Sequence, residues 1–170
     1  MRVYVPLTFP ALRDAHRAGE LAPERGGTVA YAVTPGLREW YLSDDSEELE
    51  YAALNRAAQA SLRLLAVRPE VSRRRVVLAL DVEDAVVSFD PGRGLDRESL
   101  GEVRIEGPVP LSKAAAVHMD SGEAEADVAA AADALGAADM GDDDARFTVD
   151  GAEDHELLWF ATQEIPHLTD

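Results

Sequence analysis

The chain of 170 residues contains no cysteine, and this absence excludes several kinds of chemistry at once. Disulfide bonds, iron–sulfur clusters, thiolate zinc sites and cysteine nucleophiles all require that residue. No segment approaches the run of about eighteen apolar residues that a membrane-spanning helix needs. The first residues, MRVYVPLTFP, also lack the long apolar segment of a secretory signal. We therefore expect a soluble cytoplasmic protein.

Lysine is almost absent as well. The chain has one lysine, Lys113, and fifteen arginines. Isoleucine and asparagine are equally scarce, whereas alanine, glycine, valine and aspartate are abundant. A GC-rich genome produces this residue choice, so the arginine excess is not evidence for phosphate recognition. The only dense basic cluster is the run 73–75, RRR, which precedes a predicted strand. We expect these arginines to be solvated or salt-bridged, since a nucleic-acid site needs more cations and interleaved aromatics.

Positive charge is scarce relative to negative charge, and the net charge is −17. Residues 114–170 contain 15 of the 33 acidic residues and a single base, Arg146, which gives this third of the chain a charge of −14. Such a surface repels nucleic acids and anionic lipids, so we predict neither as a direct partner. It is either a solvated surface that maintains solubility or a docking face for a basic partner. In the second case the surface could act as a mimic of a nucleic acid.

The pattern of apolar residues predicts an α/β sandwich, one domain over 1–170, with a mixed sheet of about five strands and flanking helices. Continuous or alternating apolar residues predict strands, and caps and apolar stripes predict helices. The expected strands are 2–6, 27–33, 74–82 and 114–119, with less regular segments at 85–89 and 102–110. The expected helices are 8–19, a short one after Thr34 and Pro35, 46–66 and 123–135. Towards the end we expect a loop at 136–145, a short strand at 146–150 and a last helix at 152–164 that Pro166 ends.

The last predicted helix begins like a zinc-protease motif, with His155 followed by Glu156. That motif needs a second histidine four residues on, and Trp159 occupies this position, so the motif fails. In helical projection Phe160 falls among acidic and polar side chains. Either another part of the chain covers Phe160, or it contacts a partner or a second copy of the chain. We include Phe160, Glu156 and Gln163 in a candidate interaction face.

The segment 37–51, LREWYLSDDSEELEY, combines aromatic residues with acids, five of them at 44, 45, 47, 48 and 50. Trp40 and Tyr41 complete the candidate interaction face. Aromatic residues at helix ends often close the edge of a core, which is the simpler interpretation. The alternative is a groove formed together with Phe160, in which the acids select a cationic or basic ligand.

A second candidate site consists of Asp81, Asp84, His118 and Asp120, which lie at or near the ends of two predicted strands. If these strands are parallel neighbours, the four side chains converge at one edge of the sheet. Such a cluster would hold a divalent metal or perform acid–base chemistry. The simpler interpretation is a half-buried His118 that is hydrogen-bonded to the backbone or to Asp120. The sequence indicates no other metal site and no cofactor.

Several stretches together resemble a family of small acidic cytosolic proteins from actinobacteria. They are MRVYVPLTFPAL, AVTPGLREWY, EELEYAALNRAAQASLRLLA, GPVPLSKAAAVHMD and AEDHELLWFATQEIP, and they cover almost the whole chain. The resemblance implies a single-domain cytosolic protein and brings no activity, cofactor or catalytic residue with it. We therefore favour a non-catalytic protein–protein interaction or regulatory module that binds a basic partner. A possible homodimer and a metal-dependent enzyme that uses the Asp/His cluster are the alternatives.

Overall fold

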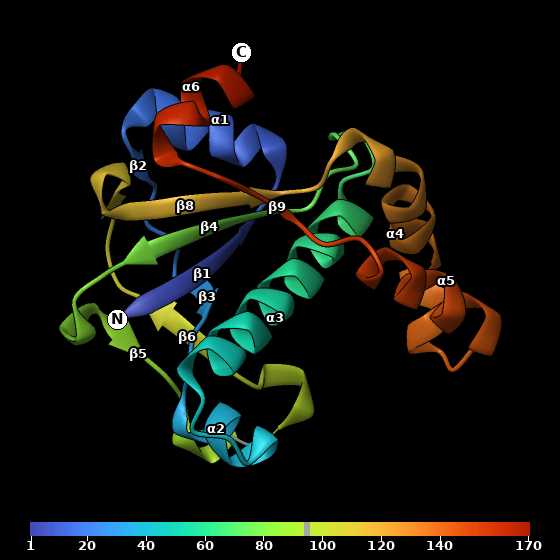
Figure 1. Ribbon diagram of the computed structural model, residues 1–170, viewed down its shortest axis with the longest axis horizontal. Helices are drawn as coiled ribbons and strands as arrows, with labels where there is room; N and C mark the ends of the chain where they lie inside the picture. The colour runs from blue at the N-terminus through green and yellow to red at the C-terminus, as the bar shows by residue number, and fades with distance from the viewer. Residues whose placement is uncertain (94–95) are drawn as a thin grey trace.

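The main sheet of the protein has seven strands in the order β5-β6-β3-β1-β4-β8-β9 (Figure 1). It is seen in a computed structural model that describes residues 1–93 and 96–170. Every neighbouring pair among these strands is antiparallel. The strands are β1 (Arg2–Leu7), β3 (Thr28–Tyr31), β4 (Val76–Asp81), β5 (Val87–Ser88), β6 (Glu102–Ile105), β8 (Ala114–Met119) and β9 (Leu158–Phe160). The α/β class is confirmed, whereas a mixed sheet of about five strands is wrong.

Helices and short connecting elements surround this sheet. The α-helices are α1 (Phe9–Ala18), α2 (Pro35–Tyr41), α3 (Ser46–Val67), α4 (Glu125–Asp139), α5 (Asp143–Glu153) and α6 (Ile165–Leu168). The 3₁₀ turns are η1 (Asp84–Val86), η2 (Pro91–Arg93), η3 (Arg97–Ser99), η4 (Leu111–Lys113), η5 (Gly122–Ala124) and η6 (Thr162–Glu164). Two short strands, β2 (Glu20–Leu21) and β7 (Val109–Pro110), pair with each other in a separate ribbon. Among the residues described, no helix has both the length and the apolar character to cross a membrane.

The first two helices begin and end where their sequences predict. The Thr8 hydroxyl accepts a hydrogen bond from the Ala11 amide, and the Thr34 hydroxyl accepts one from the Leu37 amide. Each satisfies an amide that has no partner within its helix. Gly19 ends α1 with a φ of +79°, in the left-handed region that suits a residue without a side chain.

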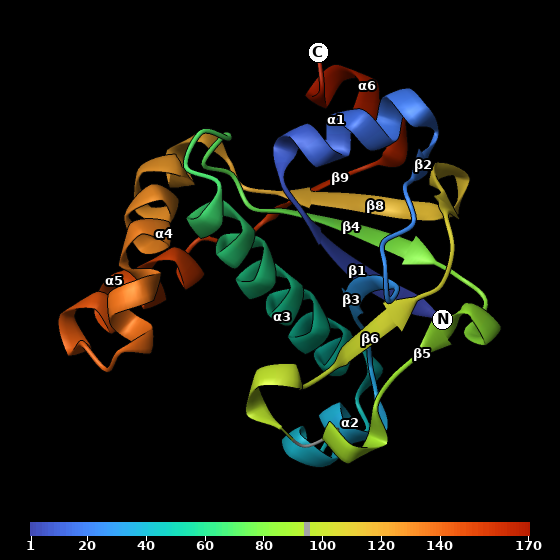
Figure 2. The same cartoon turned by 180° about the vertical axis from the view of Figure 1, so that it is seen from behind.

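Helices cover both faces of the sheet (Figures 1 and 2). On one face α1 and α6 pack against Val5, Leu78 and Val117. On the other face the alanine-rich side of α3 packs against Tyr4, Val77 and their neighbours. Alternate residues of one strand point to opposite faces, so both faces of the central strands β1 and β4 are apolar.

A buried serine fixes α3 to the sheet. The Ser61 hydroxyl donates a hydrogen bond to the Leu7 carbonyl over 2.8 Å and accepts one from the Val76 amide over 3.0 Å. Ser61 is fully buried, so water does not compete for these backbone groups. The hydroxyl thus joins the end of β1 to the start of β4 and sets the position of α3 along the sheet.

The C-terminal third differs from the sequence prediction. Helix α4 extends over the first four residues of the predicted loop at 136–145, and α5 takes up its last three residues together with the segment predicted as a strand at 146–150. The predicted helix at 152–164 is instead the end of α5, strand β9 and turn η6, and Pro166 lies in the first turn of α6. The α4–α5 hairpin extends sideways from the end of α3 (Figures 1 and 2). Its contacts with α3 are mostly alanine, leucine and valine.

A buried ion pair holds both ends of this hairpin. Two guanidinium nitrogens of Arg75, Nε and Nη2, donate to the Asp120 carboxylate over 2.8 and 2.7 Å, and the Arg75 amide donates to it over 2.8 Å. Arg75 Nη2 also donates to the His155 carbonyl over 2.9 Å. Asp120 precedes α4 and His155 follows α5, so one side chain connects the two ends of the hairpin to strand β4. The predicted salt bridges of the 73–75 run are confirmed, since Arg74 also pairs with Glu125 over 2.8 Å.

We expect Asp120→Asn and Arg75→Met each to lower the free energy of unfolding by about 3–5 kcal/mol, because each leaves one buried group unpaired. The double variant Arg75→Met/Asp120→Leu should recover more than half of that loss. Urea denaturation followed by circular dichroism measures all three. Additive losses in the double variant would contradict a coupled pair.

Candidate functional site

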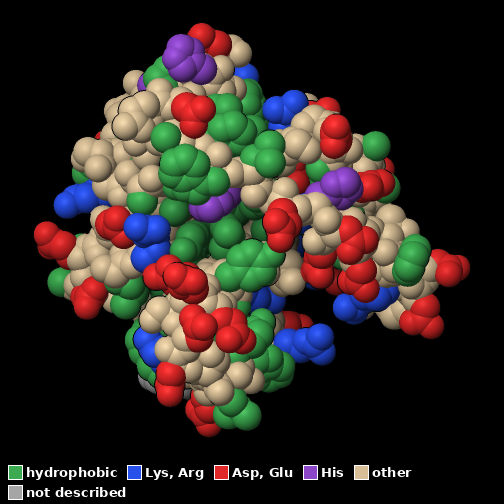
Figure 3. Space-filling view, viewed as in Figure 1, with side chains coloured by type: hydrophobic (Ala, Val, Ile, Leu, Met, Phe, Trp, Pro, Cys, Tyr) green, Lys and Arg blue, Asp and Glu red, His purple; other side chains and the backbone are tan. Residues whose placement is uncertain are grey.

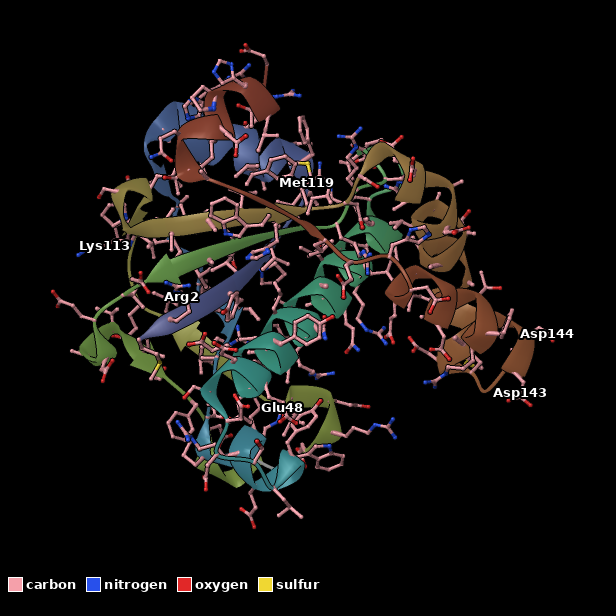
Figure 4. All side chains as sticks on the ribbon, in the orientation of Figure 1. Arg2, Glu48, Lys113, Met119, Asp143 and Asp144 are labelled. Atoms are coloured by element: carbon pink, nitrogen blue, oxygen red, sulfur yellow. The ribbon has the colours of Figure 1, made fainter. Side chains whose placement is uncertain are left out.

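Negative charge gathers on the α4–α5 hairpin (Figure 3). Asp143 and Asp144 lie at its far tip, and Lys113 lies on the opposite side of the sheet (Figure 4). The uneven distribution of charge along the sequence is therefore also uneven in space. A basic partner that approaches the molecule is attracted towards the hairpin side.

The structure does not bring together the Asp/His cluster proposed from the sequence. Because β4 and β8 are antiparallel, Asp81 and Asp84 lie at one end of this strand pair and Asp120 lies at the other. Strand geometry places the two ends roughly 15–20 Å apart. Asp81 pairs with Arg2 over 2.7 Å, and Asp84 pairs with the N-terminal amine over 3.3 Å. Among the residues described, no group of three or more potential metal ligands is arranged to hold an ion.

His118 lies between these two ends, on the face of the sheet that α3 covers in part. It is opposite Val77 on one side and Trp159 on the other, and its ring meets the Tyr4 ring edge-on at 6.4 Å. Asp120 is committed to Arg75, so the predicted hydrogen bond between His118 and Asp120 is absent. Burial lowers the pKa of His118, and the nearby positive charge of Arg2 lowers it further.

The residues proposed as an interaction face separate into two groups. Phe160 lies on β9 and packs partly buried against the core beneath α1, so it is covered from within the chain. The exposed aromatic of β9 is Trp159, with 62% of its surface accessible. Gln163 lies in η6 and is exposed, away from the helix that the sequence predicted for it. Tyr41 and Glu156, in contrast, come together in a groove.

This groove lies between α2, α3 and the segment that joins α5 to β9. It encloses about 340 Å³. Tyr41 and Tyr51 supply aromatic rings, and Glu153 and Glu156 supply carboxylates. The remaining lining residues are Leu54, Asn55, Ala58, Gln59, Arg75, His155 and Leu157.

Uncharged side chains donate hydrogen bonds to the two carboxylates of the groove. The Tyr51 hydroxyl donates to Glu156 Oε1 over 3.2 Å, and the Gln59 amide donates to Glu153 Oε1 over 3.1 Å. Neither glutamate has an ion pair among the described residues. Of the nitrogen-bearing lining residues, Arg75 pairs with Asp120, and His155 is hydrogen-bonded to Asp127. The groove therefore has uncompensated negative charge.

Exposed apolar side chains lie at the end of α2, where Tyr41 lines the groove. Trp40 is 49% exposed, Tyr41 43% and Leu42 88%, and Tyr51 on α3 is 51% exposed. The three rings are thus about half-buried, and both interpretations, the edge of a core and a binding groove, stay predictions. Leu42 is also the only residue other than glycine with positive φ among those described, at 50°. Leu42 is the left-handed cap that ends α2, a position that glycine takes more often.

Sequence reasoning identified Tyr41, Glu156 and the link between aromatics and acids, but it missed most of the groove. Tyr51 lies in the segment 37–51 but is part of neither candidate site, and the predicted helix at 152–164 contains Glu153 and Leu157, of which only Glu153 is helical, at the end of α5. Residues near 51 meet residues near 156 only through the tertiary fold, because the chain between them forms five strands and the hairpin. Local periodicity contains no such information.

The chain belongs to a family of unknown function, DUF6912, which matches residues 1–169. Comparison with the curated proteins gives no match. Comparison with the solved structures also gives none. The match confirms that one family covers the chain, whereas the actinobacterial origin and the cytosolic location that the resemblance implies stay predictions.

The depressed pKa of His118 predicts a pH dependence of stability. Since the unfolded imidazole has a pKa of about 6.5, the unfolded chain takes up this proton first as pH falls. The free energy of unfolding should be constant above that pH, fall as pH decreases through the folded-state pKa, and then level off. Urea denaturation between pH 7.5 and 5 measures the slope, which should flatten in His118→Gln and persist in the exposed control His167→Gln. A wild-type slope in His118→Gln would contradict the assignment.

The backbone of Leu42 predicts a stabilising substitution. A non-glycine residue in the left-handed region costs about 1–2 kcal/mol, and the larger freedom of glycine in the unfolded chain offsets about 0.5–1 kcal/mol of this. Leu42→Gly should therefore raise the free energy of unfolding by about 0.5–1 kcal/mol. Met140→Gly, at an exposed position with a φ of −86°, should give no gain. Equal effects of the two would show that Leu42 is not strained.

Proposed function

We propose that this protein is a non-catalytic binding module that holds an arginine- or lysine-rich segment of a protein partner in the groove. The observation that carries the proposal is the convergence of Tyr41 and Tyr51 with Glu153 and Glu156, without a free cation among the lining residues. An aromatic face attracts a guanidinium or ammonium group, and a carboxylate forms a charge-assisted hydrogen bond with it.

The surroundings of the groove support a macromolecular partner. Exposed Trp40 and Leu42 extend the apolar surface beyond the groove, as the anchors of protein interfaces do. The acidic hairpin adjoins the groove on the other side, through Glu153 at the end of α5. A basic segment longer than one residue would thus find negative charge along its length. The hairpin supplies attraction at long range and the groove supplies the specific contacts.

Fluorescence anisotropy with a labelled peptide of alternating arginine and glycine tests the proposal. We expect binding that weakens with added salt, and no binding of a peptide with glutamate in place of arginine. Tyr51→Ala should weaken binding about 5- to 30-fold, the equivalent of about 1–2 kcal/mol. Tyr51→Phe should retain most of the affinity, because it keeps the ring.

Two variants that each remove two negative charges distinguish binding in the groove from attraction by the overall negative charge of the molecule. Glu153→Gln/Glu156→Gln should weaken peptide binding at least tenfold more than Glu123→Gln/Asp133→Asn, which removes the same charge from exposed sites near and on α4. Equal losses would overturn the groove as the site. Failure of the wild type to bind the arginine peptide at low ionic strength would overturn the proposed function. Dissociation of a homodimer by the Tyr51 variants, measured by sedimentation, would assign the groove to a second copy instead.

A further inference from the structure

A second cavity lies inside the sheet, where β1 and β3 separate. It encloses about 470 Å³, within the range of small-molecule sites. Val5, Pro6 and Leu7 of β1 line one side, and Thr28 and Val29 of β3 line the other. Helix α1 covers it on one face, and Ala60 and Leu64 of α3 close the other face. Nothing in the proposed binding of a basic segment uses this cavity.

The separation of the strands has a local cause. Strands β1 and β3 pair only through Tyr4 and Tyr31, although both continue beyond that point. Hydrogen-bonded pairs recur every second residue in an antiparallel ladder, and two residues beyond Tyr4 stands Pro6, which has no amide hydrogen to donate. Gly27, with a φ of +92°, lets β3 lie against β6 instead, because a Cβ there would meet Arg104 Cβ at 3.0 Å.

An unused hydrogen-bonding group lies in the wall of this cavity. Thr28 is 6% exposed, and its hydroxyl has no hydrogen-bond partner among the described residues. A buried hydroxyl without a partner costs free energy, so Thr28 marks a part of the wall that the protein's own polar groups leave unfilled.

The charged residues that line the cavity favour a cationic ligand. Its charged lining residues are three exposed carboxylates, Asp14, Glu20 and Glu24, and no basic side chain lines it. None of the three forms an ion pair in the part of the chain that the structure describes. The other lining residues are mostly apolar. We infer that this cavity is a binding site for a small amine whose apolar chain enters between β1 and β3 while its ammonium group stays at the acidic rim.

Three probes of equal chain length test this site: octylamine, octanol and octanoate. Chemical-shift changes in ¹H–¹⁵N spectra should occur at Leu21, Thr28 and Val29 with octylamine, more weakly with octanol and least with octanoate. Changes without preference among the three would overturn the amine assignment. No saturable change with any probe would overturn the site.

Two variants with matched controls locate the probe. Ala60→Leu fills the cavity from α3 and should reduce octylamine affinity at least tenfold, whereas Ala66→Leu, on the exposed side of the same helix, should not. Asp14→Asn/Glu20→Gln/Glu24→Gln should abolish the preference for octylamine over octanol, and Glu123→Gln/Asp133→Asn should retain it. Unchanged binding in Ala60→Leu, or equal effects of the two charge sets, would overturn the assignment. None of these outcomes depends on the peptide groove.

Discussion

The buried pair of Arg75 and Asp120 is the interaction on which the arrangement of the C-terminal half depends. It joins the start of β4 to the end of β8 and, through the His155 carbonyl, to the segment that leaves α5. A guanidinium with several donors in one plane is the group that can make all these bonds at once. The contacts of this hairpin with α3 are alanine, leucine and valine side chains, and such apolar contacts have no direction, so packing alone defines the position of the hairpin weakly. The ion pair supplies the missing specificity.

Both candidate binding sites follow from the way α3 crosses the sheet. Gln59 faces the groove and Ala60 faces the cavity between β1 and β3, so adjacent residues of one helix line two different sites. Ser61, the next residue, holds the helix to the strands. The groove exists because the return of the chain from α5 to β9 passes along α3 at a distance set by Arg75. The cavity exists because Pro6 ends the pairing of β1 with β3.

Much of the N-terminal half of the fold could be predicted from the sequence, because its signals are local. The caps at Thr8 and Thr34, the stop at Gly19 and the first strand all lie where the sequence predicts them, and in the C-terminal half the strand at 114–119 does so too. The prediction of a helix at 152–164 is wrong for a physical reason. Its apolar residues fit a helical stripe, yet β9 forms by pairing with β8. Short strands take their conformation from their neighbours more than from their own residues. The periodicity of apolar residues also does not indicate whether β4 and β8 are parallel or antiparallel.

The candidate site was predictable in its chemistry and only partly in its position. Acids beside aromatics indicated a cationic ligand, and this inference needed no coordinates. Which aromatics meet which acids depends on the path of the chain between α3 and β9, so Tyr51 replaced Phe160 as the partner of Glu156. The same reasoning explains why the Asp/His cluster failed. Residues at the carboxyl ends of two neighbouring strands converge only if the strands are parallel. In this antiparallel sheet the carboxyl end of one strand lies beside the amino end of the next, and Asp81 at the end of β4 pairs with Arg2 at the start of β1.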